Sequence, residues 1–254
     1  MPLLGPGDPP PVTIDNPAGA SPFLLVGDHS GRSVPASLGQ LGLEEEHFTR
    51  HIAIDLGVRH TGLAMAALLD CPFIHQRYSR LVIDCNRGAD WETAIVAMSD
   101  GTIVPGNAAL SKADRQARID AIHRPYHDTI ATEIRRRLQE GKPVVLVSLH
   151  SFTPVMNDFR RPWQVGILHD GGDTRFNHLM LDCLREDEAL AVGDNEPYQM
   201  AGTDYTIPHH AGGANLPYVE IEVRQDLIST LGDAARWADF LSRTVKTAYA
   251  RLTG

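Results

Sequence analysis

Continuous apolar runs alternate with segments whose apolar positions follow helical spacing. Runs that predict strands lie at residues 23–26, 73–74, 81–83, 144–149, 164–168, 189–192 and 217–223. Helical spacing occurs at residues 52–69, from 111 to about 140, at 174–187 and from 233 to about 251. Runs without polar alternation, such as 144–149, are typical of strands buried on both faces of a parallel sheet. The order predicts one three-layer α/β/α domain with a mixed, mostly parallel sheet.

Two segments stand outside this alternation. Residues 1–20 are rich in Pro and Gly, which predicts a loose arm or a segment strapped to the surface, ahead of a single catalytic domain at 21–254. Residues 88–109 contain scattered Gly, Asp, Asn and Pro, and this composition predicts a long active-site loop or lid. Ser111 and Asp114 form a capping-box pattern for the helix that follows, and Pro125 is expected to interrupt that helix.

Composition restricts the class of protein. Hydrophobic residues make up 43% of the 254 residues, enough for a sizeable core, and the formal net charge of −9 disfavours nucleic acid or an anionic membrane as the main partner. The three cysteines lack metal-site spacing and are expected to be reduced. No run is long enough to span a membrane, and no Lys or Arg precedes Arg32, so a cytoplasmic location is expected. The sequence leaves the oligomeric state open.

Two histidines directly follow predicted strands. His29 comes after the 23–26 run and His150 after the 144–149 run. Open α/β sheets bind their ligands at the carboxyl ends of strands. Two imidazoles from neighbouring strand ends, with a carboxylate, form the three-ligand open zinc site used in hydrolysis. The fourth position then holds a water whose pKa falls toward neutrality.

The candidate carboxylates for such a site could have more than one role. Asp28 adjoins His29, but consecutive residues of an extended segment point apart. Asp55 lies in an apolar helical pattern and needs a partner, which is either a metal or an arginine or backbone group. Glu220 and Glu222 share one strand face, so Glu222 is either a catalytic base on a buried strand or a solvated carboxylate on an exposed edge.

Several arginines are candidates for binding an acidic substrate. Arg87 follows Asn86 after the 81–83 run, and the guanidinium fork suits a carboxylate. Arg80, Arg161 and Arg224 are further candidates, although a surface ion pair is the commoner role of any single arginine. Other chemistries fit less well, because the chain has neither a GxSxG nucleophile motif nor a glycine-rich phosphate loop after a strand.

The chain resembles the N-formylglutamate amidohydrolase family in short stretches that follow the family's order. These stretches are residues 28–32, 54–57, 79–87, 125–127, 150–154, 195–198 and 222–228. A more distant similarity is to zinc carboxypeptidases and aspartoacylases, which carry a histidine loop, an Asn-Arg pair, a strand-end histidine and a late glutamate in the same order. The resemblance therefore implies a zinc-carboxypeptidase-like fold.

The resemblance also implies roles for residues of this chain. Zinc would lie at His29 and His150, Asn86 with Arg87 would bind the substrate carboxylate, and Glu222 would act as general base and acid. One departure concerns the third ligand. The glutamate expected three residues after the first histidine is Arg32 here, so Asp55 takes that place by elimination.

Hydrolysis of N-formyl-L-glutamate to formate and L-glutamate is the expected activity, with one divalent ion, zinc first. Cobalt, manganese or iron would suit the same ligands. Arg80 or His210 is expected to stabilise the oxyanion, and Arg224 is a further residue for the acidic substrate. The alternatives are a related metal amidase acting on another N-acyl or N-formyl amino acid, and a non-catalytic binding protein that kept the fold.

Overall fold

A seven-stranded mixed sheet forms the centre of the computed structural model, which describes residues 2–254. In spatial order its strands are β1 (Val12–Asp15), β3 (Phe73–Gln76), β2 (Phe23–Gly27), β6 (Val145–Phe152), β11 (Tyr218–Arg224), β9 (Val165–Leu168) and β10 (Val192–Asp194). The four strands from β3 to β11 are parallel to one another, as are β9 and β10. The pairs β1–β3 and β11–β9 are antiparallel. The predicted mixed, mostly parallel sheet is confirmed.

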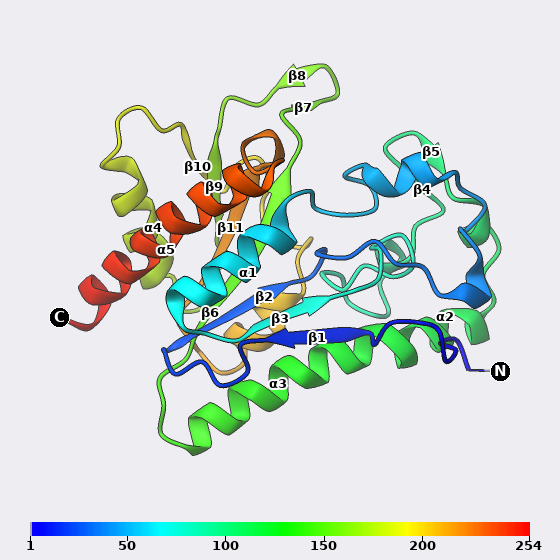
Figure 1. Cartoon of the computed structure of the whole chain (residues 1–254), viewed down its shortest axis with the longest axis horizontal. Coiled ribbons are helices and arrows are strands. Elements are labelled where there is room, and N and C mark those ends of the chain that lie inside the picture. The colour runs from blue at the N-terminus through cyan, green and yellow to red at the C-terminus, as the bar shows by residue number, and fades with distance from the viewer. Residues whose placement is uncertain (1) are drawn as a thin grey trace.

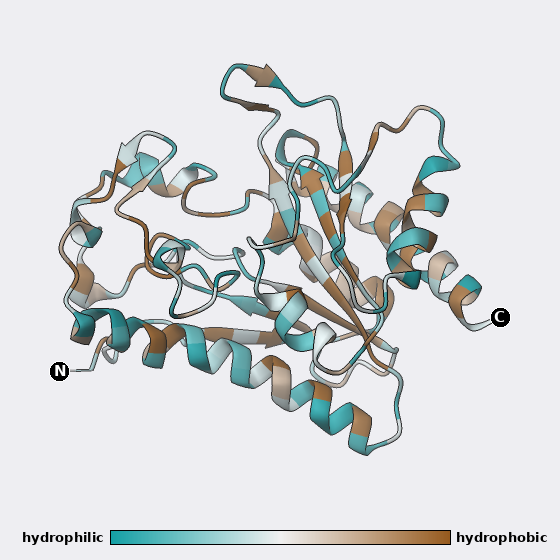
Figure 2. Cartoon of the chain, turned by 180° about the vertical axis from the view of Figure 1, so that it is seen from behind, coloured by the Kyte–Doolittle hydropathy of each residue, from teal (hydrophilic) through white to brown (hydrophobic). Residues whose placement is uncertain are grey.

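Helices cover both faces of this sheet (Figure 1). α1 (Val58–Leu69), α4 (Arg175–Arg185) and α5 (Leu231–Thr253) share one apolar cluster, while α3 (Arg124–Gln139) packs in the cluster on the opposite face. Figure 2 shows the central strands as predominantly hydrophobic and the helices as mixed. Successive side chains of a strand enter opposite clusters, which is why the runs lack polar alternation. Three layers result, as predicted.

Strand β6 is longer than the run that predicted it. His150 lies within the strand rather than after it, and its Cα pairs with Glu222 of β11 in parallel register. β10 begins at Val192, where the predicted strand at 189–192 ends. The pairing of β6 with β11 therefore places a histidine and a glutamate on adjacent strands at one level of the sheet.

The helix predicted from residue 52 begins only at Val58, and this prediction was wrong for residues 52–57. Gly57 has a positive φ of 83°, which ends helical geometry on its amino side. A Cβ at Gly57 would lie 2.3 Å from the carbonyl oxygen of Ile228, so the close approach of another segment requires glycine there. Asp55 consequently lies in a turn before α1 rather than on a helix face.

The strand predicted at 81–83 does not form. These residues are buried in a turn-rich segment whose carbonyl oxygens are satisfied by side chains instead of a neighbouring strand. Asn107 Nδ2 donates to the carbonyl of Leu81 and Arg118 Nη1 donates to that of Val82, both at 2.9 Å. Apolar content alone predicted burial correctly but not the backbone conformation.

Helix ends follow capping chemistry. α2 (Lys112–Arg118) begins with the predicted capping box of Ser111 and Asp114. A π-helical turn at Ile119–His123 connects α2 to α3 just before Pro125. The last helix, predicted from residue 233, begins two residues earlier as α5. Thr230 is its N-cap, and the Thr230 hydroxyl accepts from the backbone N–H of Asp233.

The amino-terminal segment is strapped to the surface rather than loose. β1 adds an edge strand to the sheet, and the Tyr78 hydroxyl donates to the carbonyl of Pro9 at 2.6 Å. The division of the chain into an arm at 1–20 and a single catalytic domain at 21–254 stays a prediction. Two hairpins project from the body, β4 (Met98–Ser99) with β5 (Thr102–Ile103) and β7 (Val155–Met156) with β8 (Phe159–Arg160) (Figure 1). Within residues 2–254, every helix is too short or too polar to cross a membrane.

Replacing Arg118 by Met should destabilise the fold. Arg118 is 1% exposed, and its Nη1 also donates to Asn107 Oδ1 at 2.7 Å. Burial lowers the pKa of Arg118 to about 10, against the opposing effect of Asp114, and the guanidinium is still charged at neutral pH. We expect Arg118→Met to lower the free energy of unfolding by about 2–4 kcal/mol, because buried acceptors lose a charged donor. Urea unfolding measures this change.

The exposed Arg124, which pairs with Asp120 one helical turn away, provides the control. Arg124→Met should change the free energy of unfolding by less than about 0.5 kcal/mol, as exposed ion pairs contribute little. Equal effects of the two substitutions would contradict a special role for Arg118.

Candidate metal centre and active site

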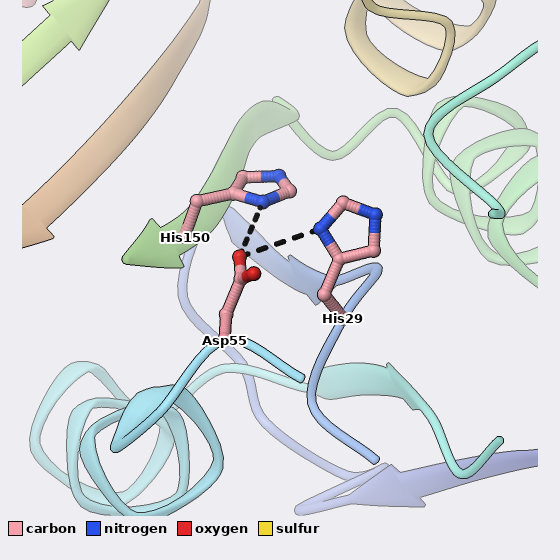
Figure 3. Close-up of side chains that lie close together, drawn as sticks. All are labelled: His29, Asp55 and His150. Carbon is pink, nitrogen blue, oxygen red and sulfur yellow. Dashed lines mark hydrogen bonds and ion pairs between the residues drawn. The ribbon is translucent and has the colours of Figure 1, made fainter. Parts of the chain in front are cut away.

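Three buried side chains converge at the carboxyl ends of the central strands. One ligand atom from each of His29, Asp55 and His150 lies within 4.8 Å of the others. Asp55 Oδ2 is 3.3 Å from His29 Nδ1 and 3.0 Å from His150 Nδ1 (Figure 3). His29 follows β2, Asp55 precedes α1 and His150 belongs to β6, so the fold brings together segments far apart in the sequence.

Two further carboxylates hold the outer nitrogens of these histidines. His29 Nε2 is 2.7 Å from Asp84 Oδ1, and His150 Nε2 is 3.1 Å from Asp28 Oδ2. A carboxylate on the far nitrogen orients an imidazole and makes it a better ligand. Both rings thereby direct Nδ1 toward Asp55. Two imidazoles and one carboxylate, oriented in this way, fit a divalent transition-metal ion.

The charges of this cluster compensate one another. Burial alone would lower the pKa of His150, but its contacts with Asp28 and Asp55 raise that pKa well above the usual value. Burial would raise the pKa of Asp55, but His29 and His150 bring it far below the usual range. A divalent ion bound at Nδ1 of each ring would take the place of a proton there.

A cavity of about 550 Å³ opens onto the three residues. The predicted site residues in its lining are His29, Asp55, Arg80, Asn86, Arg87, His150 and Glu222. Thr93, Val96, Ser99 and Asp100 also line it, so the predicted loop at 88–109 forms part of the wall. The structure thus gathers the metal-ligand candidates, the base candidate and the Asn-Arg pair around one space.

Glu222 lies on a buried central strand, which excludes the exposed-edge interpretation. It is 5% exposed, and its Oε2 has no hydrogen-bond partner among the described residues. Burial raises the pKa of Glu222 to about 8, against the opposing effect of His150. Burial and the nearby Asp204 carboxylate raise the pKa of Glu220 well above its usual range. A carboxyl group with a pKa near neutrality can both accept and return a proton.

Both arginines of the cavity contact carboxylates. Arg80 donates through Nε and Nη2 to Asp84 Oδ2 at 3.1 and 2.7 Å, and its Nη1 is 3.4 Å from Asp55 Oδ1. Arg87 Nη1 donates to the carbonyl of Asn86 at 2.8 Å and lies 3.4 Å from Asp204 Oδ1. Arg80 is therefore held firmly beside the cluster, whereas Arg87 has a looser carboxylate contact.

Asn86 is fully engaged in positioning the loop that carries Asp204. Its Oδ1 accepts from the backbone N–H groups of Tyr205 and Thr206, both at 3.0 Å, and its Nδ2 donates to Asp204 Oδ1 at 2.9 Å. This arrangement connects the 79–87 segment to the 201–206 loop across the cavity.

Two predicted substrate residues lie outside the described lining of the cavity. His210 Nε2 is 3.0 Å from His127 Nδ1, and burial lowers the pKa of His210 to about 3. Arg224 lies at the end of β11 and donates to Asp226 Oδ1 at 2.8 Å. Arg161, a further candidate, is buried and donates to the hydroxyl of Tyr198 at 3.0 Å.

Sequence reasoning missed three carboxylates of the site. Asp28 was set aside because it points away from His29, and that same direction takes it to the outer nitrogen of His150. Asp84 follows an apolar run directly, which was a usable signal. Asp204 belongs to a polar loop in which no periodic pattern distinguishes it.

Comparison with known proteins gives a family and solved structures of similar fold. The family model of N-formylglutamate amidohydrolase matches residues 21–229. The crystal structure of gene product Atu2144 from Agrobacterium tumefaciens is 34% identical, covers 99% of this chain and 100% of that chain, and has a TM-score of 0.96. An N-formylglutamate amidohydrolase from Ralstonia eutropha JMP134 shares the fold at 20% identity, with a TM-score of 0.61 over 93% of this chain and 98% of that chain.

A search of curated protein sequences gave no match. The family model nevertheless spans most of the chain, including both histidines, Asp55 and Glu222. The chain therefore belongs to the N-formylglutamate amidohydrolase family.

Proposed function

We propose that this protein is a metal-dependent amidohydrolase that releases formate from N-formyl amino acids. N-formyl-L-glutamate, named by the family, is the first substrate, and the products are formate and L-glutamate. The observation that carries the proposal is the buried cluster of His29, Asp55 and His150 on the same cavity as Glu222, whose Oε2 has no hydrogen-bond partner within residues 2–254. Membership of the family supports hydrolysis of an amide bond.

His29, Asp55 and His150 would hold one divalent ion, and zinc is proposed first because two imidazoles and a carboxylate suit it. Such an ion would lower the pKa of a water molecule and polarise the formyl carbonyl. Asp28 and Asp84 keep the two imidazoles in the orientation this requires. Arg80 lines the cavity beside this centre and remains charged, which makes it the proposed donor for the oxyanion.

Glu222 is proposed to move the proton. As a carboxylate it takes a proton from the attacking water while the water oxygen bonds to the formyl carbon. The C–N bond then breaks, and Glu222 returns the proton to the departing amine nitrogen, which leaves formate and the free amino acid. Its buried Oε2, which lacks a partner in the described part of the chain, and its pKa of about 8 suit both directions of transfer.

The Asn86–Arg87 pair is proposed to bind the carboxylate of the substrate. Arg87 lines the cavity, and its 3.4 Å contact with Asp204 is loose enough for a substrate carboxylate to replace. A second candidate function is hydrolysis of another N-acyl amino acid. The excess of carboxyl groups over guanidinium groups in the cavity favours this alternative.

Formate release should depend on a metal bound at the cluster. We expect chelation to abolish formate release from N-formyl-L-glutamate and one equivalent of zinc to restore it. Asp55→Ala should retain less than about a tenth of the bound zinc, because the anionic ligand is lost. Formate assay and elemental analysis measure these effects. His60→Ala, at an exposed position of α1, is the control and should bind zinc normally. Full activity of thoroughly chelated protein would contradict the proposal.

Glu222→Gln should lower kcat by about 10²–10⁴-fold, since it removes general acid–base catalysis. Zinc content should stay at the wild-type level, because Glu222 is not among the three proposed ligands. Steady-state formate release and elemental analysis of the same samples measure both effects. Glu188→Gln, at an exposed position, is the matched control. Unchanged turnover of the Glu222 variant would remove Glu222 from the mechanism.

Arg87→Met should raise KM about 10–100-fold while kcat changes much less, because a charged hydrogen bond to the substrate carboxylate is lost. Arg243→Met, exposed on α5, should leave both parameters unchanged. A fall in kcat with constant KM would show that Arg87 acts on the reacting group rather than on a distant carboxylate.

A further inference from the structure

A chain of hydrogen bonds leads from the outer nitrogen of His29 to Thr206. His29 Nε2 is 2.7 Å from Asp84 Oδ1, and the same carboxylate oxygen accepts from the backbone N–H of Asn86 at 2.9 Å. The side chain of Asn86 continues the chain, because its Oδ1 accepts from the backbone N–H of Thr206 at 3.0 Å. Thr206 therefore stands at the end of a chain that starts at one of the two histidines.

The hydroxyl of Thr206 leads to the other histidine. Thr206 Oγ1 donates to Asp28 Oδ1 at 2.8 Å, and the second oxygen of that carboxylate, Oδ2, is 3.1 Å from His150 Nε2. Ser148 Oγ also lies 3.1 Å from His150 Nε2, so Asp28 is one of two groups on this nitrogen. Through its backbone and its side chain, Thr206 thus connects the outer contacts of both imidazoles.

The proton of the Thr206 hydroxyl is directed to Asp28. Thr206 is 0% exposed, so water does not compete for this contact. The alternative acceptor is the carbonyl of Cys85, which is farther from Oγ1, at 3.4 Å, and lies 2.9 Å from His127 Nε2. A hydroxyl has one proton to donate, and a bond to a carboxylate is stronger than one to a carbonyl. The structure therefore assigns the donor to Asp28 Oδ1.

Thr206 acts on the site without touching the space for the substrate. Ala201, Thr203 and Asp204 of the same loop line the cavity, whereas Thr206 lies outside the described lining. A carboxylate on the far nitrogen of an imidazole fixes the orientation of that ring as a ligand. The carboxylate can do this only when it is itself held, and Thr206 holds the oxygen of Asp28 that does not face His150.

We propose that Thr206 is a positioning residue of the metal centre, which fixes Asp28 and, through Asp28, the imidazole of His150. This inference rests on the proposed metal site and adds a residue that neither contacts the ion nor reaches the substrate. Removing the hydroxyl leaves Asp28 Oδ1 buried without this donor, and a buried acceptor that has lost its partner favours a different orientation of the carboxylate. His150 then presents Nδ1 less accurately, which weakens metal binding.

Zinc affinity tests the role without turnover. Thr206→Val removes the hydroxyl but keeps the side-chain shape and the backbone N–H that binds Asn86. Competition with a chromophoric chelator should show that Thr206→Val raises the Kd for zinc about 10–100-fold, the usual effect of losing an outer contact of a ligand. Thr206→Ser, which keeps the hydroxyl, should restore tight binding.

Thr244→Val is the matched control for loss of a buried threonine hydroxyl. Thr244 lies within α5, where its Oγ1 donates to the carbonyl of Phe240 at 3.0 Å, so this variant should bind zinc like the wild type. Equal zinc affinity of Thr206→Val and the wild type would overturn the proposal. A loss in Thr206→Ser as large as that in Thr206→Val would also overturn it.

The visible spectrum of the cobalt-loaded protein separates positioning of a ligand from anchoring of a loop. Cobalt suits the same ligands, and its absorption depends on their geometry. At saturating cobalt, Thr206→Val should alter the bands, while Thr206→Ser and Thr244→Val should keep the wild-type spectrum. Urea unfolding of the same variants measures stability separately. Lower stability of Thr206→Val with an unaltered spectrum would identify a loop anchor and overturn the positioning role.

Formate release from N-formyl-L-glutamate distinguishes failure of this inference from failure of the proposed function. Zinc-dependent release by the wild type, together with unchanged zinc affinity of Thr206→Val, would preserve the hydrolase and overturn the positioning role. Weakened zinc binding by Thr206→Val, together with no formate release by the zinc-loaded wild type, would support the positioning role and contradict the proposed reaction.

Discussion

Compensation of buried charge around Asp55 is the interaction on which the site depends. Its Oδ2 lies between the Nδ1 atoms of His29 and His150, and the outer nitrogens of these rings contact Asp84 and Asp28. Each of these groups would be costly to bury alone, because removing one partner leaves an uncompensated charge. Mutual contact makes burial tolerable and also orients the imidazoles for a metal ion.

That cluster depends in turn on a segment without regular secondary structure. Residues 79–87 provide Asp84, Arg80 and the Asn86–Arg87 pair, and several of their backbone carbonyls are held by side chains of other segments. Arg118 binds the carbonyl of Val82, and His123 Nε2 lies 2.9 Å from the carbonyl of Arg87. These contacts place a loop on a rigid scaffold, as catalytic sites require.

The pattern of apolar and polar positions predicted much of the fold, because the periodicity that distinguishes helices from strands can be read from residues close together in the sequence. The 144–149 run became β6, and alternation correctly placed Glu220 and Glu222 on one face of β11. The failures arose where an apolar segment satisfies its backbone in another way. Residues 81–83 use side-chain donors, and residues 52–57 end at a glycine with positive φ.

The sequence by itself determined the order of the candidate site residues along the chain. His29, Asn86–Arg87, His150 and Glu222 lie at or near the ends of apolar runs, where a shared site was expected. Tertiary structure alone decided which atoms meet. It brought Asp28, Asp84 and Asp204 into the site and kept His210 and Arg224 out of the cavity lining. The physical reason is that local periodicity specifies the face of an element, whereas contacts between distant side chains depend on strand register and on how loops pack.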